Sequence, residues 1–272
     1  MTAATSMTTN DRIAIELGED GVAEVRFTRG DKMNALDPEM FVRIIEAGSV
    51  LQRMKGLRVV VLSGEGRAFC AGLDTASFTR QPGQDEPPLT ERTYGNANKF
   101  QQVSMQWRKL PVPVIAAVHG VCFGGGLAIA SGADIRIVHP ATRMSIMELK
   151  WGLVPDMGGY ALWRGLVRDD VLRELIYTNR EFTGAEAQGL GLATHVDENP
   201  LDRARAIARE IANRNPQAIR AAKRLQAGML ERETDAILLE ESIEQHAIMR
   251  SPNQVEAVMA AMQKRRANFQ DV

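Results

Sequence analysis

Two glycine-bearing turns, each directly after an apolar run, are the clearest sites for chemistry in this 272-residue chain. The first spans residues 69–74 (FCAGLD) after the run 59–62, and the second is the triple glycine 124–126 after the run 114–118. Glycine lets a backbone approach a ligand closely and leaves its N–H groups pointing outward. Two N–H groups that converge on one oxygen would form an oxyanion hole, although tight strand-to-helix turns also require glycine for geometry alone.

A carboxylate among apolar neighbours, Glu148, could move protons, and a second carboxylate, Asp156, follows it by eight residues. Glu148 stands in the segment 146–151 (IMELKW), and an apolar setting raises a carboxyl pKa toward the range that a general base or acid needs. Asp156 follows in the segment 155–159 (PDMGG). Each also has a structural interpretation, Glu148 as a surface carboxylate at a helix start and Asp156 as the N-cap of a helix near Gly158.

Other chemistries lack their sequence signatures. The glycines 124–126 do not form the G-x-G-x-x-G pattern of dinucleotide-binding folds, and no Gly-Lys-Ser/Thr follows them as in a phosphate-binding loop. The four histidines have no metal-ligand spacing, so we expect no metal site. A formal net charge of −1 gives no reason to expect a nucleic-acid or membrane partner.

The composition, 44% hydrophobic and 25% charged, is ordinary for a soluble globular protein. No run of about 18 consecutive apolar residues exists, and residues 1–10 lack the charged and apolar regions of a signal peptide. The two cysteines, Cys70 and Cys122, predict buried reduced thiols rather than a disulfide framework. We therefore expect a cytoplasmic protein whose residues 1–10 form a loose tail.

The elements around the turns alternate between strands and helices. The pattern predicts a helix over 37–53, capped by Asp37, and a helix over 92–109, with a polar surface loop over 77–91 between them. Period-2 alternation and apolar runs predict strands at 12–17, 22–28, 58–64, 113–119, 133–138, 143–146 and 192–197.

The pattern of apolar residues predicts that the last quarter of the chain is helical. Amphipathic segments punctuated by proline predict helices at 201–214, 216–229, 231–249 and 252–268. The strand–helix alternation followed by this tail predicts an α/β protein. We expect residues 11–199 to form its core and residues 200–272 a C-terminal helical subdomain.

The turns and carboxylates fall in five blocks that resemble, in order, the crotonase (enoyl-CoA hydratase/isomerase) superfamily. No single block is specific, but together they cover nearly the whole chain: 32–36 (KMNAL), 66–74 (GRAFCAGLD), 113–126, 147–159 and 264–269 (KRRANF). The resemblance implies the crotonase spiral, a core of stacked ββα turns with C-terminal helices that drive trimerisation. It also implies a homotrimer or a dimer of trimers.

The resemblance implies a role for several residues. The backbone N–H groups of Leu73 and Gly125 would form the oxyanion hole for the thioester of an acyl-CoA substrate, and Glu148 would be a catalytic acid–base group. Lys264 matches a position that meets the CoA of a neighbouring subunit, although the usual aromatic before it is Ala261 here. Coenzyme A would arrive with the substrate, so no separate cofactor is expected. The resemblance further implies that CoA is bound by Lys32, Asn34, Ala35, Leu36, Ala71, Gly72 and Asp74.

One departure from the family pattern bears on the reaction. Family hydratases carry a second glutamate at the position of Ala128, and two carboxylates can hold and activate a water, which alanine cannot do. An acid at Asp156 instead resembles the dienoyl-CoA isomerases, in which the acids matching Glu148 and Asp156 move protons at the two ends of a conjugated system. Those isomerases also usually keep an acid at the position of Ala128.

Three hypotheses follow. The first is an acyl-CoA isomerase that shifts a double bond with Glu148 and Asp156. The second is an enoyl-CoA hydratase, a lyase, that uses Glu148 without the usual second glutamate. The third is a non-catalytic CoA-binding protein that keeps Leu73 and Gly125 but not turnover. Acyl chain length cannot be predicted from the sequence.

Overall fold

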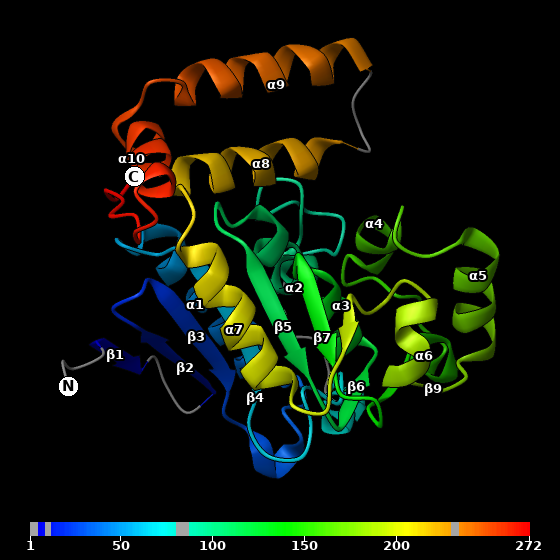
Figure 1. The fold of residues 1–272 in the computed structure, drawn as a ribbon. Helices are drawn as coiled ribbons and strands as arrows, with labels where there is room; N and C mark the ends of the chain where they lie inside the picture. The colour runs from blue at the N-terminus through cyan, green and yellow to red at the C-terminus, as the bar shows by residue number, and fades with distance from the viewer. Residues whose placement is uncertain (1–4, 9–11, 80–86, 230–233) are drawn as a thin grey trace.

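A computed structural model describes residues 5–8, 12–79, 87–229 and 234–272 of the chain. A large sheet runs through the middle of the molecule and carries helices on both faces (Figure 1). Its first three strands pair antiparallel and the others pair parallel. In spatial order the strands are β1 (Thr5–Thr8), β2 (Ile13–Leu17), β3 (Val22–Phe27), β4 (Val59–Gly64), β5 (Val114–Val118), β7 (Ile135–Val138) and β10 (His195–Val196).

A second, smaller layer of extended chain lies beside the large sheet. It contains β6 (Val121–Phe123), β8 (Arg143–Ser145) and β9 (Phe182–Thr183), and single parallel bridges join Leu36 to Leu73 and Cys70 to Cys122. Each pass of the chain thus adds one strand to the large sheet and one extended segment to the small layer. This is the predicted spiral of stacked turns, and it brings the two glycine turns side by side.

Helices close the two faces of the large sheet. Helices α1 (Pro38–Arg53), α2 (Lys99–Lys109) and α3 (Gly125–Ser131) pack together on one face, and α7 (Pro200–Ala212) covers the other (Figure 1). Strands β4 and β5 are buried along almost their whole length because both of their faces are covered. This explains their continuous runs of valine, isoleucine, leucine and alanine.

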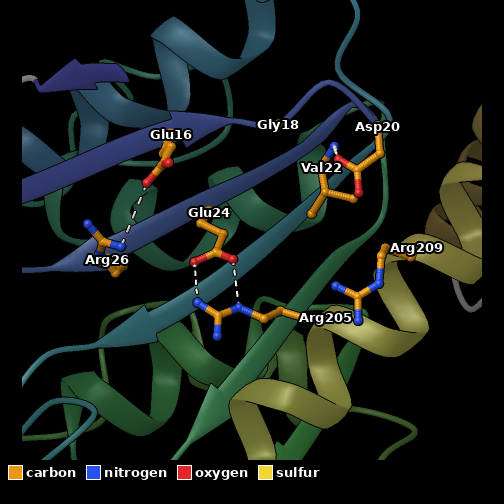
Figure 2. Close-up of a pocket in the computed structure, with 8 residues that line it drawn as sticks. All are labelled: Glu16, Gly18, Asp20, Val22, Glu24, Arg26, Arg205 and Arg209. Carbon is orange, nitrogen blue, oxygen red and sulfur yellow. Dashed lines mark hydrogen bonds and ion pairs between the residues drawn. The ribbon is translucent and has the colours of Figure 1, made fainter. Parts of the chain in front are cut away.

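Helix α7 is fixed to the sheet by a bidentate ion pair. The Arg205 guanidinium donates to both carboxylate oxygens of Glu24 on β3, at 2.7 and 2.8 Å (Figure 2). The two residues border a polar hollow of about 290 Å³, where Arg26 also lies 3.9 Å from Glu16. The charges of this hollow largely pair with one another, so we do not take it as the functional site.

The remaining helices lie beside and beyond the core. Helices α4 (Gly159–Trp163), α5 (Asp169–Thr178) and α6 (Gly184–Gly189) lie at one side (Figure 1). Helices α8 (Pro216–Gly228) and α9 (Thr234–Ile248) pack against each other away from the sheet, and α10 (Pro252–Met262) follows. Within the described chain, no helix is long and apolar enough to cross a membrane.

The structure corrects several sequence-based boundaries. Residues 5–8 of the expected loose tail form β1, because the outer edge of β2 offers them a ladder partner. Helix α2 begins at Lys99 rather than 92, since Asn98 and Gln101 form a capping box there. Helix α10 ends at Met262 and not 268, and β10 is only two residues long.

Three further predictions concern a loop, a helix and a domain boundary. In the predicted loop 77–91, a 3-10 helix covers Thr75–Thr79, and residues 80–86 lie outside the described residues. Residues 231–233, the start of the predicted helix 231–249, also lie outside the described residues. The boundary at residue 200 stays a prediction, but α7 packs on β4, β5 and β7 and is therefore part of the core layering.

Candidate active site

The first glycine turn is held between two neighbouring segments. Its Ala71 N–H donates to Met33 O at 3.0 Å, and Gly72 O accepts from Leu36 N–H at 2.8 Å. Gly72 has a φ of +86°, which glycine adopts without strain, and a Cβ there would lie 2.7 Å from Phe123 O. The turn therefore packs directly against the chain entering the second turn.

The second turn begins at Gly124, whose φ of +47° and close neighbours both require glycine. Its N–H donates to Ser145 O at 3.0 Å, which anchors the turn to β8. At Gly125 a Cβ would lie 2.6 Å from Met157 Sδ and 2.9 Å from Leu36 Cδ1. A larger residue at Gly125 would therefore have to displace the ends of the Met157 and Leu36 side chains.

The backbone N–H groups of Leu73 and Gly125 make no hydrogen bond to any residue that the structure describes. Both residues line the same cavity. Buried backbone donors are almost always paired, so two unpaired donors at one cavity indicate a place for an acceptor atom. The contact between Gly72 and the second turn gives the proximity that two converging donors need.

Glu148 lies against the second turn, at the start of a 3-10 helix that covers Glu148–Trp151. A Cβ at Gly124 would lie 3.1 Å from Glu148 Oε1, and Glu148 Oε2 is buried without a partner among the described residues. Burial raises the pKa of this carboxyl group, and the nearby charge of Asp156 raises it further. Glu148 is thus a carboxyl group suited to taking up a proton.

Asp156 lines the same cavity, in the loop before α4. Partial removal of its hydration raises its pKa as well, although the side chain remains exposed toward the cavity. The N-cap of α4 is Gly158, with no side-chain capping bond, so Asp156 does not cap that helix. The structural interpretation of Asp156 is therefore wrong.

One cavity of about 1050 Å³ joins both turns and both carboxylates. Of the residues predicted to bind CoA, five line it: Lys32, Ala35, Ala71, Gly72 and Asp74. Its apolar lining includes Phe41, Leu89, Phe100, Trp151, Leu153, Val154 and Met157. Ala128 is buried like every other residue of α3, and α3 contains no carboxylate that could reach the cavity.

Three predicted CoA-binding residues lie elsewhere in the structure. Asn34 is fully buried, and its side chain donates to Glu65 O at 3.0 Å and Ala68 O at 2.8 Å. Leu36 is also fully buried and offers only its backbone to the first turn. Lys264 is exposed after the end of α10 and does not line the cavity of this chain. The Asn34 side chain thus has a structural role, and the CoA contact predicted along the backbone of residues 32–36 stays a prediction.

Arg29, which the sequence interpretation missed, links the parts of the site. Its guanidinium donates to Ala35 O at 2.9 Å and to Asp74 Oδ2 at 2.7 Å, and it lies 3.4 Å from Asp37 Oδ2. The Arg29 hydrogen bond lowers the pKa of Asp74. One arginine after a strand carries no sequence signal for this role, because its three partners are apart in the chain.

The comparisons with known proteins agree with this fold and show the family. A family model described as enoyl-CoA hydratase/isomerase matches residues 18–272. Human mitochondrial Delta(3,5)-Delta(2,4)-dienoyl-CoA isomerase is 31% identical over 221 residues, 78% of this chain and 67% of that protein. An enoyl-CoA hydratase from Mycobacterium tuberculosis is 33% identical over 219 residues, 76% of this chain and 80% of that protein.

The likeness extends to solved structures. The crystal structure of an enoyl-CoA hydratase from Mycobacterium smegmatis superposes with a TM-score of 0.83 at 26% identity, over 95% of this chain and 99% of that one. A spiral α/β fold with two free donors and two carboxylates at one cavity defines the class as acyl-CoA enzymes of the crotonase type. The chain belongs to the enoyl-CoA hydratase/isomerase family.

Proposed function

We propose that this protein is an acyl-CoA isomerase that shifts a carbon–carbon double bond through a thioester enolate. One observation carries the proposal: two carboxyl groups with raised pKa values, Glu148 and Asp156, share a cavity with the free N–H groups of Leu73 and Gly125. Donors for a developing oxyanion and groups that move protons are the two requirements of this reaction.

In this proposal the thioester oxygen accepts hydrogen bonds from Leu73 and Gly125. One carboxylate removes a proton from the carbon next to the thioester, and charge moves to the oxygen, where each donor contributes about 2.7–4 kcal/mol. The other carboxyl group, protonated, gives a proton to the far end of the conjugated system. The double bond moves and the substrate gains or loses no atoms. Because the charge of Asp156 disfavours ionisation of Glu148, the pair favours one ionised and one protonated group, as this proton transfer requires.

Hydration is the second candidate, because the buried Oε2 of Glu148 has no protein partner among the described residues and can accept from a water. Helix α3, however, presents Ala128 where family hydratases carry their second glutamate. A single carboxylate would then have to both orient and activate the water. We place isomerisation first for this reason.

A paired assay with the purified protein tests the proposal. It follows hydration of crotonyl-CoA and isomerisation of 3-enoyl-CoA and 3,5-dienoyl-CoA. We expect isomerisation with little hydration, and Glu148→Gln and Asp156→Asn each to lower isomerisation by about 10²–10⁴-fold, the usual contribution of a positioned acid or base. The control is Asp169→Asn, an exposed carboxylate on α5 outside the cavity, which should retain activity.

The other outcomes separate the remaining hypotheses. Robust hydration that Asp156→Asn leaves intact would overturn the isomerase proposal and establish a hydratase that works with Glu148. Absence of turnover on all substrates, together with measurable CoA binding, would favour the non-catalytic CoA-binding hypothesis.

We also propose how CoA lies in the site. Its pantetheine would follow the backbone of residues 32–36 and 71–74, with Lys32 at the cavity mouth near a phosphate. CoA would enter as part of the substrate, with no further cofactor. We propose a cytoplasmic location, supported by the free, buried thiols of Cys70 and Cys122, which suit a reducing compartment.

We further propose a homotrimer or a dimer of trimers. The support is that the last two helices expose large apolar side chains: Leu239, Ile243, Val255, Val258, Met259 and Met262. Exposed apolar surface of this kind marks protein–protein contacts. The molar mass in solution, measured by light scattering, tests it, and a monomer would contradict it.

A further inference from the structure

The segment that carries Glu148 leaves the small layer of strands just before this residue. Strand β8 pairs with β6 up to Ser145 and with β9 only up to Met144. Ile146 and Met147 then lead to the 3-10 helix that begins at Glu148. No strand in the described part of the chain pairs with these two residues, so strand pairing does not set the direction in which the chain approaches the carboxylate.

Asn179, at the C-terminal end of α5, provides a contact at this point. Its side-chain amide donates to Ile146 O at 2.7 Å and to Ile176 O, in the last turn of α5, at 2.8 Å. The two N–H groups of the amide are thus both used, one on its own helix and one on the segment before Glu148. The Ser145 hydroxyl also donates to Asn179 O, at 3.0 Å. Two hydrogen bonds therefore join the end of α5 to residues 145 and 146.

Helix termination explains only part of this arrangement. Asn179 has a φ of +51°, in the left-handed region that glycine adopts without strain and asparagine adopts more readily than most residues. A glycine would therefore end α5 as well, but it would lack the amide. The bond to Ile176 O belongs to the end of the helix, whereas the bond to Ile146 O reaches a segment 33 residues away.

The bond to Ile146 O acts on the peptide unit that joins Ile146 to Met147. This peptide is trans, so its C=O and N–H groups point to opposite sides. Asn179 holds the C=O, and the N–H of Met147, on the other side, forms a hydrogen bond with the Glu148 carboxylate. Burial raises the pKa of Glu148, and the backbone N–H groups of Glu148 and Met147 oppose part of that rise. One peptide unit thus connects Asn179 with the carboxylate.

The same contacts support the second glycine turn. Ser145 is fully buried, and its carbonyl oxygen accepts from the Gly124 N–H at 3.0 Å while its hydroxyl binds Asn179. Glu148 lies against Gly124, so the turn and the carboxylate depend on one short stretch of chain. Asn179 is not among the described residues that line the cavity, so its effect on a substrate would pass through this stretch.

We propose that Asn179 is a positioning residue of the active site, whose amide holds the Ile146 carbonyl and thereby sets the direction of the Glu148 carboxylate. The consequence for turnover rests on the proposed function, in which Glu148 moves a proton, but the hydrogen bonds do not depend on it. Helix α5, which lies at one side of the core, thus takes part in placing the group that transfers the proton (Figure 1).

The variant Asn179→Gly tests this role, because glycine keeps the left-handed turn and removes the side-chain amide. We expect kcat to fall by up to about a hundredfold through misplacement of the carboxylate, with little change in KM. We also expect the acid limb of the kcat/KM–pH profile to move to higher pH, because the carboxylate loses the Met147 N–H and ionises less readily. Asp156, whose charge also raises the pKa of Glu148, is unchanged in this variant.

The matched control is Thr178→Val, at the neighbouring position of α5. It removes a bond of the same length as the one to Ile146 O, from Thr178 Oγ1 to Glu174 O at 2.7 Å, which stays within the helix. We expect this variant to keep the kcat and the pH profile of the wild type, because it leaves the contact between Asn179 and Ile146 in place.

Three results would overturn the inference. The first is an unchanged kcat in Asn179→Gly, and the second is an equal loss of kcat in Asn179→Gly and Thr178→Val, since the amide would then serve only to end α5. The third is a loss of kcat with an acid limb that does not move, because turnover would then fail for a reason other than the direction of Glu148.

Failure of the proposed function is distinguishable from failure of this inference. The kcat is measured for whichever reaction the paired assay finds, since isomerisation and hydration both use Glu148 in the hypotheses above. If neither reaction occurs, the pKa of the Glu148 carboxyl group is followed by carbon-13 NMR, with Glu148→Gln for assignment. A higher pKa in Asn179→Gly than in the wild type supports the inference, and an equal or lower pKa overturns it.

Discussion

Glu148 lies against Gly124, is largely buried, and has a side-chain oxygen, Oε2, without a partner among the described residues. Because its pKa in the folded protein is above the ordinary value of 4.5, the folded state favours the protonated form. The ionised carboxylate therefore lowers stability at neutral pH. Asp156, on the same cavity, adds to this effect because its negative charge disfavours a second one nearby.

The variant Glu148→Gln should therefore be more stable than the wild type at neutral pH. The gain should shrink as the pH falls through the raised pKa and vanish below about 4.5, where both the folded and the unfolded chains are protonated. Urea unfolding at neutral and acidic pH measures it. An equal gain in the free energy of unfolding at neutral and at acidic pH would contradict the raised pKa of Glu148. In the wild type, the same shift should move the acid limb of the kcat/KM–pH profile, which reports the free enzyme, upward from the range of an ordinary glutamate.

At the scale of elements, the site depends on how three segments are connected. Arg29 binds the early segment through Ala35 O, the first turn through Asp74, and the start of α1 through Asp37. Its side chain is 14% exposed, so these contacts are well shielded from water. The position of the Leu73 N–H is therefore set partly by a residue that does not line the cavity.

Arg29→Met should lower kcat by up to about a hundredfold through misplacement of the first turn, with a smaller effect on KM. Arg29→Lys should recover only part of kcat, because one ammonium group cannot bridge the three partners with the same geometry. Arg12→Met is the matched control, since Arg12 also contacts Asp37, at 3.0 Å. If both methionine variants lose kcat equally, Arg29 has no positioning role.

At the scale of the whole molecule, a buried ion pair joins the C-terminal helices to the core. Lys223 on α8 lies 2.7 Å from Asp134 and donates to Trp107 O and Val112 O at 3.0 and 2.7 Å. Asp134 in turn accepts from Val114 N–H at 2.7 Å, at the start of β5. This one amine therefore connects α8 with the end of α2 and, through Asp134, with the start of β5.

Lys223→Met should lower the free energy of unfolding by about 3 kcal/mol, the lower end for a broken buried pair, because Asp134 keeps some contact with water. The control is Arg224→Met, next along the same helix, which breaks the more exposed pair with Glu244 and should cost at most about 1 kcal/mol. Urea unfolding measures both. Equal, small losses would show that the buried pair does not hold α8 to the core.

The sequence by itself determined the features that depend on neighbouring residues. The two glycine turns, the apolar strands before them and the cap of α1 at Asp37 are local, because turn geometry, burial on both faces and capping act within a few residues. The ordered blocks that resemble the crotonase superfamily were sufficient to predict the family, which the comparisons confirm.

Tertiary structure decided what depends on contacts between distant segments. Only the stacking of successive turns brings Leu73 beside Gly125 and places Glu148 against Gly124. The Asn34 side chain is buried and donates to the backbone oxygen of Ala68 instead of facing the cavity. Residues 5–8 form β1 because the edge of β2 pairs with them. A side chain's exposure and its ionic partners depend on which distant segments pack against it. The residue types along one segment do not specify these exposures and ionic partners. The geometry that joins the segments of the candidate site therefore depends on the tertiary structure.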